Sequence, residues 1–172
     1  MRRQPDPAFL AVLRAQQEPL LRAARLLTGD WPAAEQLLRD TLVWAVGAWQ
    51  SLEASGTAPV RLRQRMISAY LADTSPEDPE EDFSQEEDEA ADLLRAGDLS
   101  KLRGIPHPAS FDEGLAVLPP EDRVIVVSRY YLSLSAAEIG EVLDVDDEEV
   151  DAIAVSVLAA LRRSTADVGG RE

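Results

Sequence analysis

The sequence of 172 residues contains no cysteine and only one histidine. The absence of cysteine excludes disulfide bonds, thiolate metal sites and cysteine nucleophiles. The single histidine, His107, lies between two prolines and cannot supply a multi-histidine metal site by itself. Aromatic residues are only 5% of the chain, whereas Leu, Ala and Val are abundant, which favours helices over sheets. We therefore expect an all-α protein that binds no metal and no cofactor.

Long hydrophobic runs are also absent. No apolar run approaches the roughly 18 residues that a membrane span needs, and the polar, proline-containing start of the chain differs from a signal peptide. A cytoplasmic location without a membrane partner is expected. No glycine-rich phosphate loop and no nucleophile–base pair is present in the sequence, so we do not expect an enzyme.

Basic residues are scarce, and they are unevenly distributed. The net charge is −15, which argues against general nucleic-acid binding because phosphates require a basic surface. Residues 1–72 carry a net charge of +3, whereas residues 73–110 and 111–172 each carry −9. The acidity thus begins abruptly at Asp73.

The first 72 residues indicate a small domain of three helices. Apolar residues at helical spacing predict helices over residues 8–27, 31–52 and 60–72. Pro19 is expected to divide or kink the first helix. Gly29 is a suitable residue to end it, and Asp30 is a suitable N-cap for the second.

An acidic linker is predicted over residues 73–110. Residues 73–92 contain eleven acidic and no basic side chains, a composition typical of solvated, disordered chain. A short helix over residues 85–96 is the alternative for part of this segment.

A second helical domain is predicted over residues 111–166, followed by a tail over 167–172. Helices are expected over 111–118, 121–132, 136–143 and 147–163. Ser135 and Glu138 form a capping box at the start of the third of these. A short helix, a tight turn over 144–146 and a longer amphipathic helix together indicate a helix-turn-helix.

Two blocks of this sequence resemble a known family. The first contains LLRAARLLTGD at 20–30 and AAEQLLRDTL at 33–42, followed by Trp49. The second, over 115–161, contains LPP at 118–120, RYY at 129–131 and AEI at 137–139. In this order, the blocks resemble conserved regions 2 and 4 of the sigma-70 factors of RNA polymerase. The closest resemblance is to the extracytoplasmic-function type found in actinobacteria.

The resemblance implies a role for each element. In that family the helix matching residues 35–41 docks on RNA polymerase core, the third helix melts and reads the −10 promoter element, and the last helix reads the −35 element. The linker threads towards the RNA exit path. The residues expected to bind polymerase or another partner are Glu35, Gln36, Leu38, Arg39, Asp40 and Thr41.

The third helix departs from the family pattern at its end. Ser68 stands where family members commonly have Asn, and the chain then continues with acidic residues instead of the aromatic and basic residues that hold a separated DNA strand. Arg61, Arg63 and Arg65 remain as candidates for residual DNA contact. Alternatively, they form a solvated face or contact the acidic linker.

The final helix departs further. The turns that should face the DNA major groove have an acidified surface formed by Asp146, Asp147, Glu148, Glu149 and Asp151. Acids in the first turn interact favourably with the helix dipole, by about 0.3–1 kcal/mol each, but this accounts for only one or two of the five. We therefore expect no conventional −35 recognition, and promoter DNA is a doubtful partner.

Three functions remain open after these comparisons of residues. The leading hypothesis is a sigma-factor-like regulator of transcription initiation that binds RNA polymerase core, with weak or partner-dependent promoter binding. The second is a sigma mimic that sequesters an anti-sigma factor. The third is an acidic DNA mimic that blocks a basic channel through the stretch 77–92.

Overall fold

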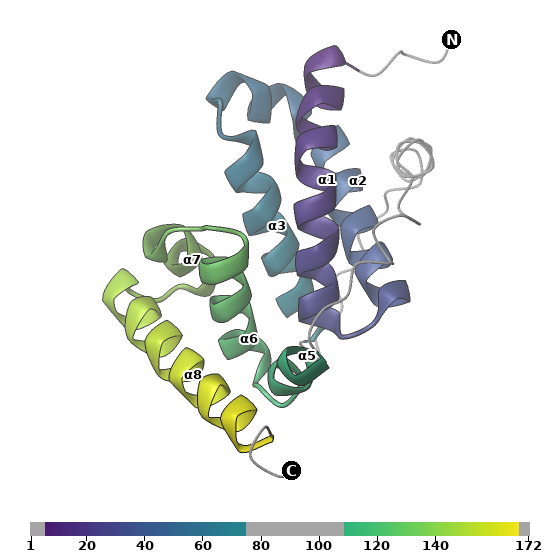
Figure 1. Ribbon diagram of the computed structural model, residues 1–172. Helices are drawn as coiled ribbons and strands as arrows, with labels where there is room; N and C mark the ends of the chain where they lie inside the picture. Colours follow the sequence, from purple (N-terminus) through teal and green to yellow (C-terminus); the bar gives the residue numbers. More distant parts are fainter. Residues whose placement is uncertain (1–5, 75–108, 169–172) are drawn as a thin grey trace.

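The computed structural model describes residues 6–74 and 109–168 (Figure 1). These residues form seven α-helices and one π-helical turn, without any strand, so the expected all-α fold is confirmed. In chain order the elements are α1 (Pro7–Thr28), α2 (Trp31–Ser55), α3 (Ala58–Asp73), α5 (Ala109–Ala116), α6 (Pro120–Val126), the π-helix η2 (Val127–Tyr131), α7 (Ala136–Leu143) and α8 (Asp147–Val168). The segments 75–108 and 169–172, including the predicted linker helix, lie outside the described residues.

Helices α1, α2 and α3 form one unit, which we call the N-terminal unit. Each of the three packs against the other two. Their contact is made by side chains with less than 2% exposure, including Leu20, Leu21, Leu38, Leu42, Met66 and Ile67. Burying a Leu, Ile or Met side chain completely stabilises a fold by about 1.5–3 kcal/mol. The apolar stripes seen in the sequence thus become the interior of this unit.

Helix α1 begins and ends as the sequence indicates, but it is not divided at Pro19. The Asp6 carboxylate accepts a hydrogen bond from the Ala8 amide (2.8 Å) at its start. Gly29 adopts a left-handed conformation (φ 82°) at its end and donates its N–H to the Arg25 carbonyl. The helix continues through Pro19 because the carbonyl that loses its donor belongs to Ala15, an exposed residue, where water can replace the missing N–H.

Helices α5 to α8, with η2, form the C-terminal unit. The predicted capping box is present: the Glu138 amide donates to Ser135 Oγ (3.2 Å), and the Ser135 amide donates to a Glu138 carboxylate oxygen (2.8 Å). Helix α7 ends at Asp144, which is left-handed (φ 56°) and begins the predicted tight turn. Helix α8 then packs back across α5, α6 and α7, which completes a helix-turn-helix.

The turn between α7 and α8 depends on Gly140. This residue is buried, and the backbone carbonyl of Val145 lies where a Cβ atom at position 140 would stand. The Val145 amide also donates to the Gly140 carbonyl (3.2 Å). Only glycine allows the two segments to approach so closely.

The helix predicted over 121–132 changes type in its second half. After α6 the chain forms η2, and the Leu132 amide donates to the Val127 carbonyl five residues earlier. The wider turn directs the side chains of Arg129 and Tyr131 to different neighbours. Arg129 pairs with Asp151 of α8 (3.2 Å), whereas the Tyr131 hydroxyl interacts with Arg22 of α1.

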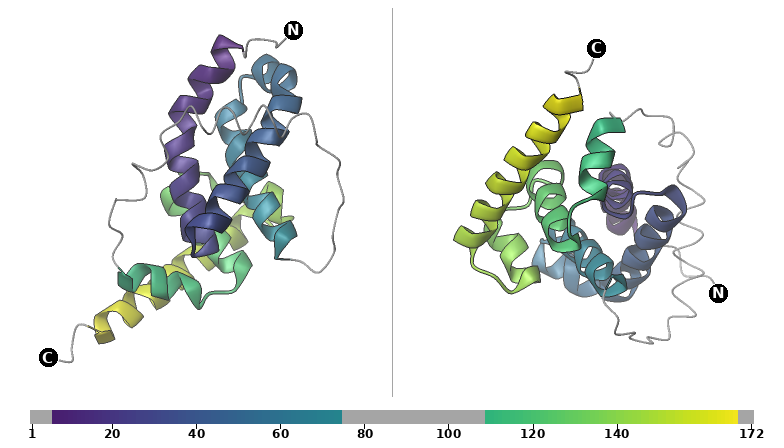
Figure 2. Two further views of the ribbon diagram at one scale, coloured as in Figure 1. Left: turned by 90° about the vertical axis from the view of Figure 1, so that its right-hand side faces the viewer. Right: turned by 90° about the horizontal axis from the view of Figure 1, so that it is seen from below.

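The two units pack directly against each other. Helix α3 contacts α6 and α7, while α1 contacts α5, α6 and η2. Figure 2 shows α8 on the outer side of the C-terminal unit, away from the N-terminal unit. Buried apolar side chains of both units form one continuous hydrophobic cluster. The two predicted domains therefore share one apolar cluster, a contact that the sequence left open.

Neither a membrane-spanning helix nor a metal-binding cluster is found in the described part of the chain. Within residues 6–74 and 109–168, no helix is long and apolar enough to cross a membrane. The same residues contain no group of three or more His, Cys, Asp or Glu side chains arranged to hold a metal ion.

Replacing Gly140 by Ala should destabilise the fold by roughly 1–3 kcal/mol, because the new methyl group meets backbone that cannot rotate away. Gly47→Ala is the matched control: Gly47 is an exposed residue inside α2, so the better helix propensity of Ala should stabilise the protein by up to about 1 kcal/mol. Urea unfolding followed by circular dichroism measures both. Equal changes in the two variants would contradict the close contact at Gly140.

Candidate functional site

The residues predicted to bind a partner on α2 divide into an inner and an outer group. Leu38 and Thr41 are completely buried, and the Thr41 hydroxyl donates to the Leu37 carbonyl (2.8 Å). These two side chains hold α2 in the unit and cannot touch a partner in this arrangement. Glu35 is half-buried.

The outer group consists of Gln36, Arg39 and Asp40, which we call the α2 face. All three residues are exposed, and the Gln36 side-chain amide donates to the Asp40 carboxylate (2.8 Å), which orders this turn of the surface. Their helix packs mainly on α1 and α3, on the inner side. The α2 face thus presents one amide, one cation and one carboxylate at the surface, and the amide and the carboxylate are hydrogen-bonded to each other.

The three arginines of α3 do not form one exposed basic strip. Arg61 is half-exposed and pairs with Glu141 of α7 (3.1 Å). Arg63 donates to the Gln16 side chain (3.0 and 3.2 Å) and to the Leu132 carbonyl (3.0 Å) of the C-terminal unit.

Arg65 has a third environment. Its guanidinium carbon lies 5.8 Å from the centre of the Trp44 ring, a cation–π contact within the N-terminal unit. Its Nε atom is buried without a hydrogen-bond partner. Each α3 arginine therefore already contacts other protein groups. The contacts of Arg61 and Arg63 with the C-terminal unit were not predicted from the sequence.

Between these arginines lies Gln64, a buried polar residue that sequence reasoning missed. Its side-chain amide donates to the Glu138 carbonyl (2.9 Å) and to the Glu141 carboxylate (2.9 Å), while its oxygen accepts from Arg61 (3.1 Å). The pKa of the Glu141 carboxyl is lowered below its ordinary value. The largest cause is the hydrogen bond from Gln64, followed by the hydrogen bond from Arg61 and the positive charge of Arg61.

A second contact between the units centres on Arg123 of α6. Its five N–H groups make five hydrogen bonds of 2.7–3.1 Å. Two reach the N-terminal unit, at the Leu27 carbonyl and the Tyr70 hydroxyl. The other three end on carbonyls at the end of α5, those of Leu115, Ala116 and Leu118. The whole donor capacity of the guanidinium is used.

The acidified surface of α8 is solvent-facing. Asp146, Asp147, Glu148, Glu149 and Asp151 are all exposed, and Val150 between them points into the core. Asp151 is paired with Arg129 (3.2 Å), and the Asp147 carboxylate caps the Glu148 amide (3.0 Å). Farther along the same helix, Val155 is 65% exposed. This surface presents carboxylates where a DNA-reading helix presents neutral or basic groups.

Comparison with known proteins shows what this architecture is similar to. Residues 114–163, which extend from α5 to α8, match the family "Sigma-70, region 4". The RNA polymerase sigma-E factor of Streptomyces coelicolor is 26% identical, over 90% of this chain and 84% of that protein. The resemblance to the extracytoplasmic-function sigma-70 factors is confirmed. The sigma-E factor of Streptomyces avermitilis is 29% identical, over 90% of this chain and 83% of that protein.

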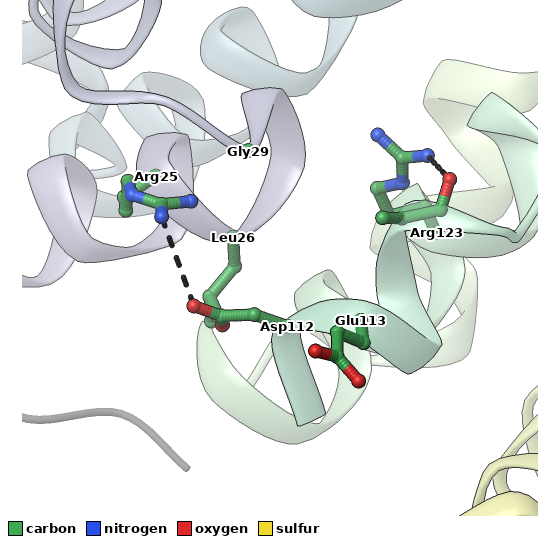
Figure 3. A pocket seen from close by; sticks show the side chains of 7 residues that line it. Arg25, Leu26, Gly29, Asp112, Glu113 and Arg123 are labelled. Carbon is green, nitrogen blue, oxygen red and sulfur yellow. Dashed lines mark hydrogen bonds and ion pairs between the residues drawn. The ribbon is translucent and has the colours of Figure 1, made fainter. Parts of the chain in front are cut away.

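A partly open cavity of about 230 Å³ lies where the two units meet. Figure 3 shows Arg25 and Leu26 of α1 on one side and Asp112 and Glu113 of α5 on the other, with Arg25 and Asp112 3.8 Å apart. Arg123 also lines the cavity, but all its donors are already bonded. The cavity marks the joint between the units.

The Glu141 contact predicts a pH dependence. Because the pKa of this carboxyl is lowered from 4.5 by folding, its contribution to the packing of the two units is present above about 4.5 and is lost as the pH falls through the folded-state pKa. Gln64→Ala should raise the Glu141 pKa, as followed by carboxyl-carbon NMR. Gln36→Ala, on the far helix, is the control and should leave it unchanged. An identical Glu141 titration in wild type and Gln64→Ala would refute the contact.

Arg123→Lys should destabilise the protein by roughly 2–4 kcal/mol, because an ammonium group cannot replace a five-donor planar fork and leaves carbonyls without donors. Arg129→Lys provides the comparison. Arg129 makes an exposed ion pair with Asp151, so its loss should cost less than about 1 kcal/mol. Urea unfolding measures both, and a similar loss in the two variants would show that Arg123 is not the central contact.

Proposed function

We propose that this chain is a non-enzymatic, cytoplasmic sigma-factor-like regulator of transcription initiation that binds RNA polymerase core through the α2 face. Its promoter contacts are weak or depend on a partner. The relatives named as RNA polymerase sigma factors support the role in initiation. We place the binding face on α2 because residues 35–41 resemble the helix by which that family docks on the polymerase.

The observation that carries the proposal is the contrast between α2 and α3. Gln36, Arg39 and Asp40 are all exposed, whereas Arg63 and Arg65 are only partly exposed and contact the Leu132 carbonyl and the Trp44 ring; Arg61 is half-exposed and pairs with Glu141. A partner protein can therefore reach α2 without rearrangement of the fold. A DNA strand that requires Arg63 and Arg65 would have to displace their present protein contacts.

Electrostatics supports weak DNA recognition by α8. A carboxylate about 4 Å from a phosphate costs on the order of 1 kcal/mol even at the dielectric constant of water. Five exposed carboxylates in the first turns of α8 multiply this cost, and the few basic groups of the unit do not compensate, because residues 111–172 carry a net charge of −9.

Sequestration of an anti-sigma factor is the second candidate. It would use protein-binding surfaces alone, so the exposed α2 face and the acidic α8 surface suit it as well. The third candidate, a DNA mimic, depends on the acids at 77–92, which lie outside the described residues. Affinity purification from the native cytoplasm distinguishes the first two by the identity of the captured protein.

The α2 face can be tested by charge reversal. Asp40→Lys should weaken binding to RNA polymerase core by about tenfold or more, because it reverses a charge at the contact and removes the Gln36 hydrogen bond. Glu53→Lys makes the same charge change at an exposed position near the other end of α2 and should leave the affinity within about twofold. Fluorescence anisotropy with purified core measures both variants.

Two results would count against the proposal. Equal weakening by Asp40→Lys and Glu53→Lys would mean that only overall charge matters. Absence of any core binding by the wild-type chain at low salt would exclude the polymerase version and favour the anti-sigma candidate.

A further inference from the structure

The cavity between α1 and α5 is lined by charges of both signs. Arg25 lies on its α1 side, and Asp112 and Glu113 lie on its α5 side (Figure 3). Leu26 and Ala116 also line it. With a volume of about 230 Å³, it is smaller than the roughly 300–1,000 Å³ of pockets that take drug-sized ligands, so a matching ligand has about ten non-hydrogen atoms or fewer.

The guanidinium of Arg25 keeps most of its hydrogen-bonding capacity. Its carbon lies 5.8 Å from the centre of the Trp31 ring, which holds one face of the group. The distance from its Nη2 to the nearer oxygen of Asp112 is 3.8 Å, which is too long for a hydrogen bond. Arg123, in the wall of the same cavity, has five bonded N–H groups. Arg25 is therefore the cation of this cavity that still has donors to give.

The carboxylate of Asp112 is matched just as incompletely. Its Oδ1 atom is buried without a hydrogen-bond partner in the described part of the chain, and its Oδ2 atom is the one 3.8 Å from Arg25. The side chain remains 28% exposed. Glu113 adds a second, exposed carboxylate beside it. Because a carboxylate taken from water without donors is destabilised, an added donor at this position is favourable.

We propose that this cavity binds a small zwitterion: a free α-amino acid with a short apolar side chain. Its carboxylate accepts from Arg25, and its ammonium group donates to Asp112. Both charges of such a molecule lie on one carbon, so it can lie antiparallel to the pair, with each charge beside its opposite. A simple anion would meet the two carboxylates, and a simple cation would meet two guanidinium groups. Leu26 and Ala116 suit the alkyl side chain.

The bound amino acid would bridge the two units, because its two charges contact α1 and α5. Binding to the folded chain alone also stabilises it against unfolding. This inference goes beyond the proposed function and does not use the α2 face. Amino-acid binding and core binding can therefore fail separately, since the experiments below contain no polymerase.

The first experiment changes the ligand and leaves the protein unchanged. The ¹⁵N-labelled full chain is titrated with L-valine, and saturable shifts of the amides of Gly29 and Glu113, which line the cavity, are expected. N-acetyl-L-valine lacks the ammonium group and L-valinamide lacks the carboxylate, so each should bind about tenfold or more weakly. Absence of saturable shifts up to about 10 mM L-valine, shifts only at residues far from the cavity, or equal binding of the three compounds would overturn the proposal.

The second experiment removes the negative charge of the site. Asp112→Asn keeps the shape of the side chain and should weaken L-valine binding by about fivefold or more, because a charge-assisted hydrogen bond becomes a neutral one. Asp146→Asn makes the same change at an exposed residue outside the cavity and should leave the affinity within about twofold. Equal affinity of the two variants, with circular dichroism showing both folded, would contradict the assigned contact.

A third pair of variants tests the cation. Arg25→Gln should weaken L-valine binding by about fivefold or more, whereas Arg14→Gln, at an exposed position on the same helix, should not. Loss of L-valine binding in Arg25→Gln with retained binding of L-valinamide at its wild-type affinity would locate the carboxylate at Arg25. Equal affinities of Arg25→Gln and Arg14→Gln for L-valine would exclude it.

Discussion

The relative position of the two units depends most directly on one guanidinium group. Arg123 donates to carbonyls at the ends of α1 and α5, where helices leave acceptors without intrahelical partners, and the helix dipoles favour a cation there. A guanidinium removed from water is costly unless all its donors are matched, and here five acceptors from three segments match them. Rotation of one unit against the other would break the two bonds that cross between them, to the Leu27 carbonyl and the Tyr70 hydroxyl.

The acidity of the C-terminal unit has two separate consequences. Glu141, on α7, points towards the N-terminal unit and neutralises Arg61. The carboxylates from Asp146 to Asp151, on α8, point to solvent and repel a phosphate backbone. Neither group of carboxylates is part of the apolar core, so the helices pack independently of the surface charge. The difference in net charge between residues 1–72 and residues 111–172 therefore lies on surface side chains and leaves the packing of the helices unchanged.

Local signals predicted the helices and their ends well. Gly29 and the Ser135–Glu138 capping box act through neighbours within four residues, so the sequence alone contains all their partners. The contacts of Gln64 and Arg123 could not be predicted, since their partners lie 74 and 96 residues away and no local pattern marks them. On the candidate partner helix, the family motif contains both buried and exposed residues, and only the structure separates Leu38 from the α2 face.

The π-helical turn η2 sets the register between α1 and α8. It contains one residue more per turn than an α-helix, and this extra residue directs Tyr131 to Arg22 and Arg129 to Asp151. Deleting a single residue within 127–131 would restore α-helical winding and rotate the following side chains by about 100°. Because η2 belongs to the C-terminal unit, a change of length at this turn would affect both its contact with α1 and the Arg129–Asp151 pair within that unit.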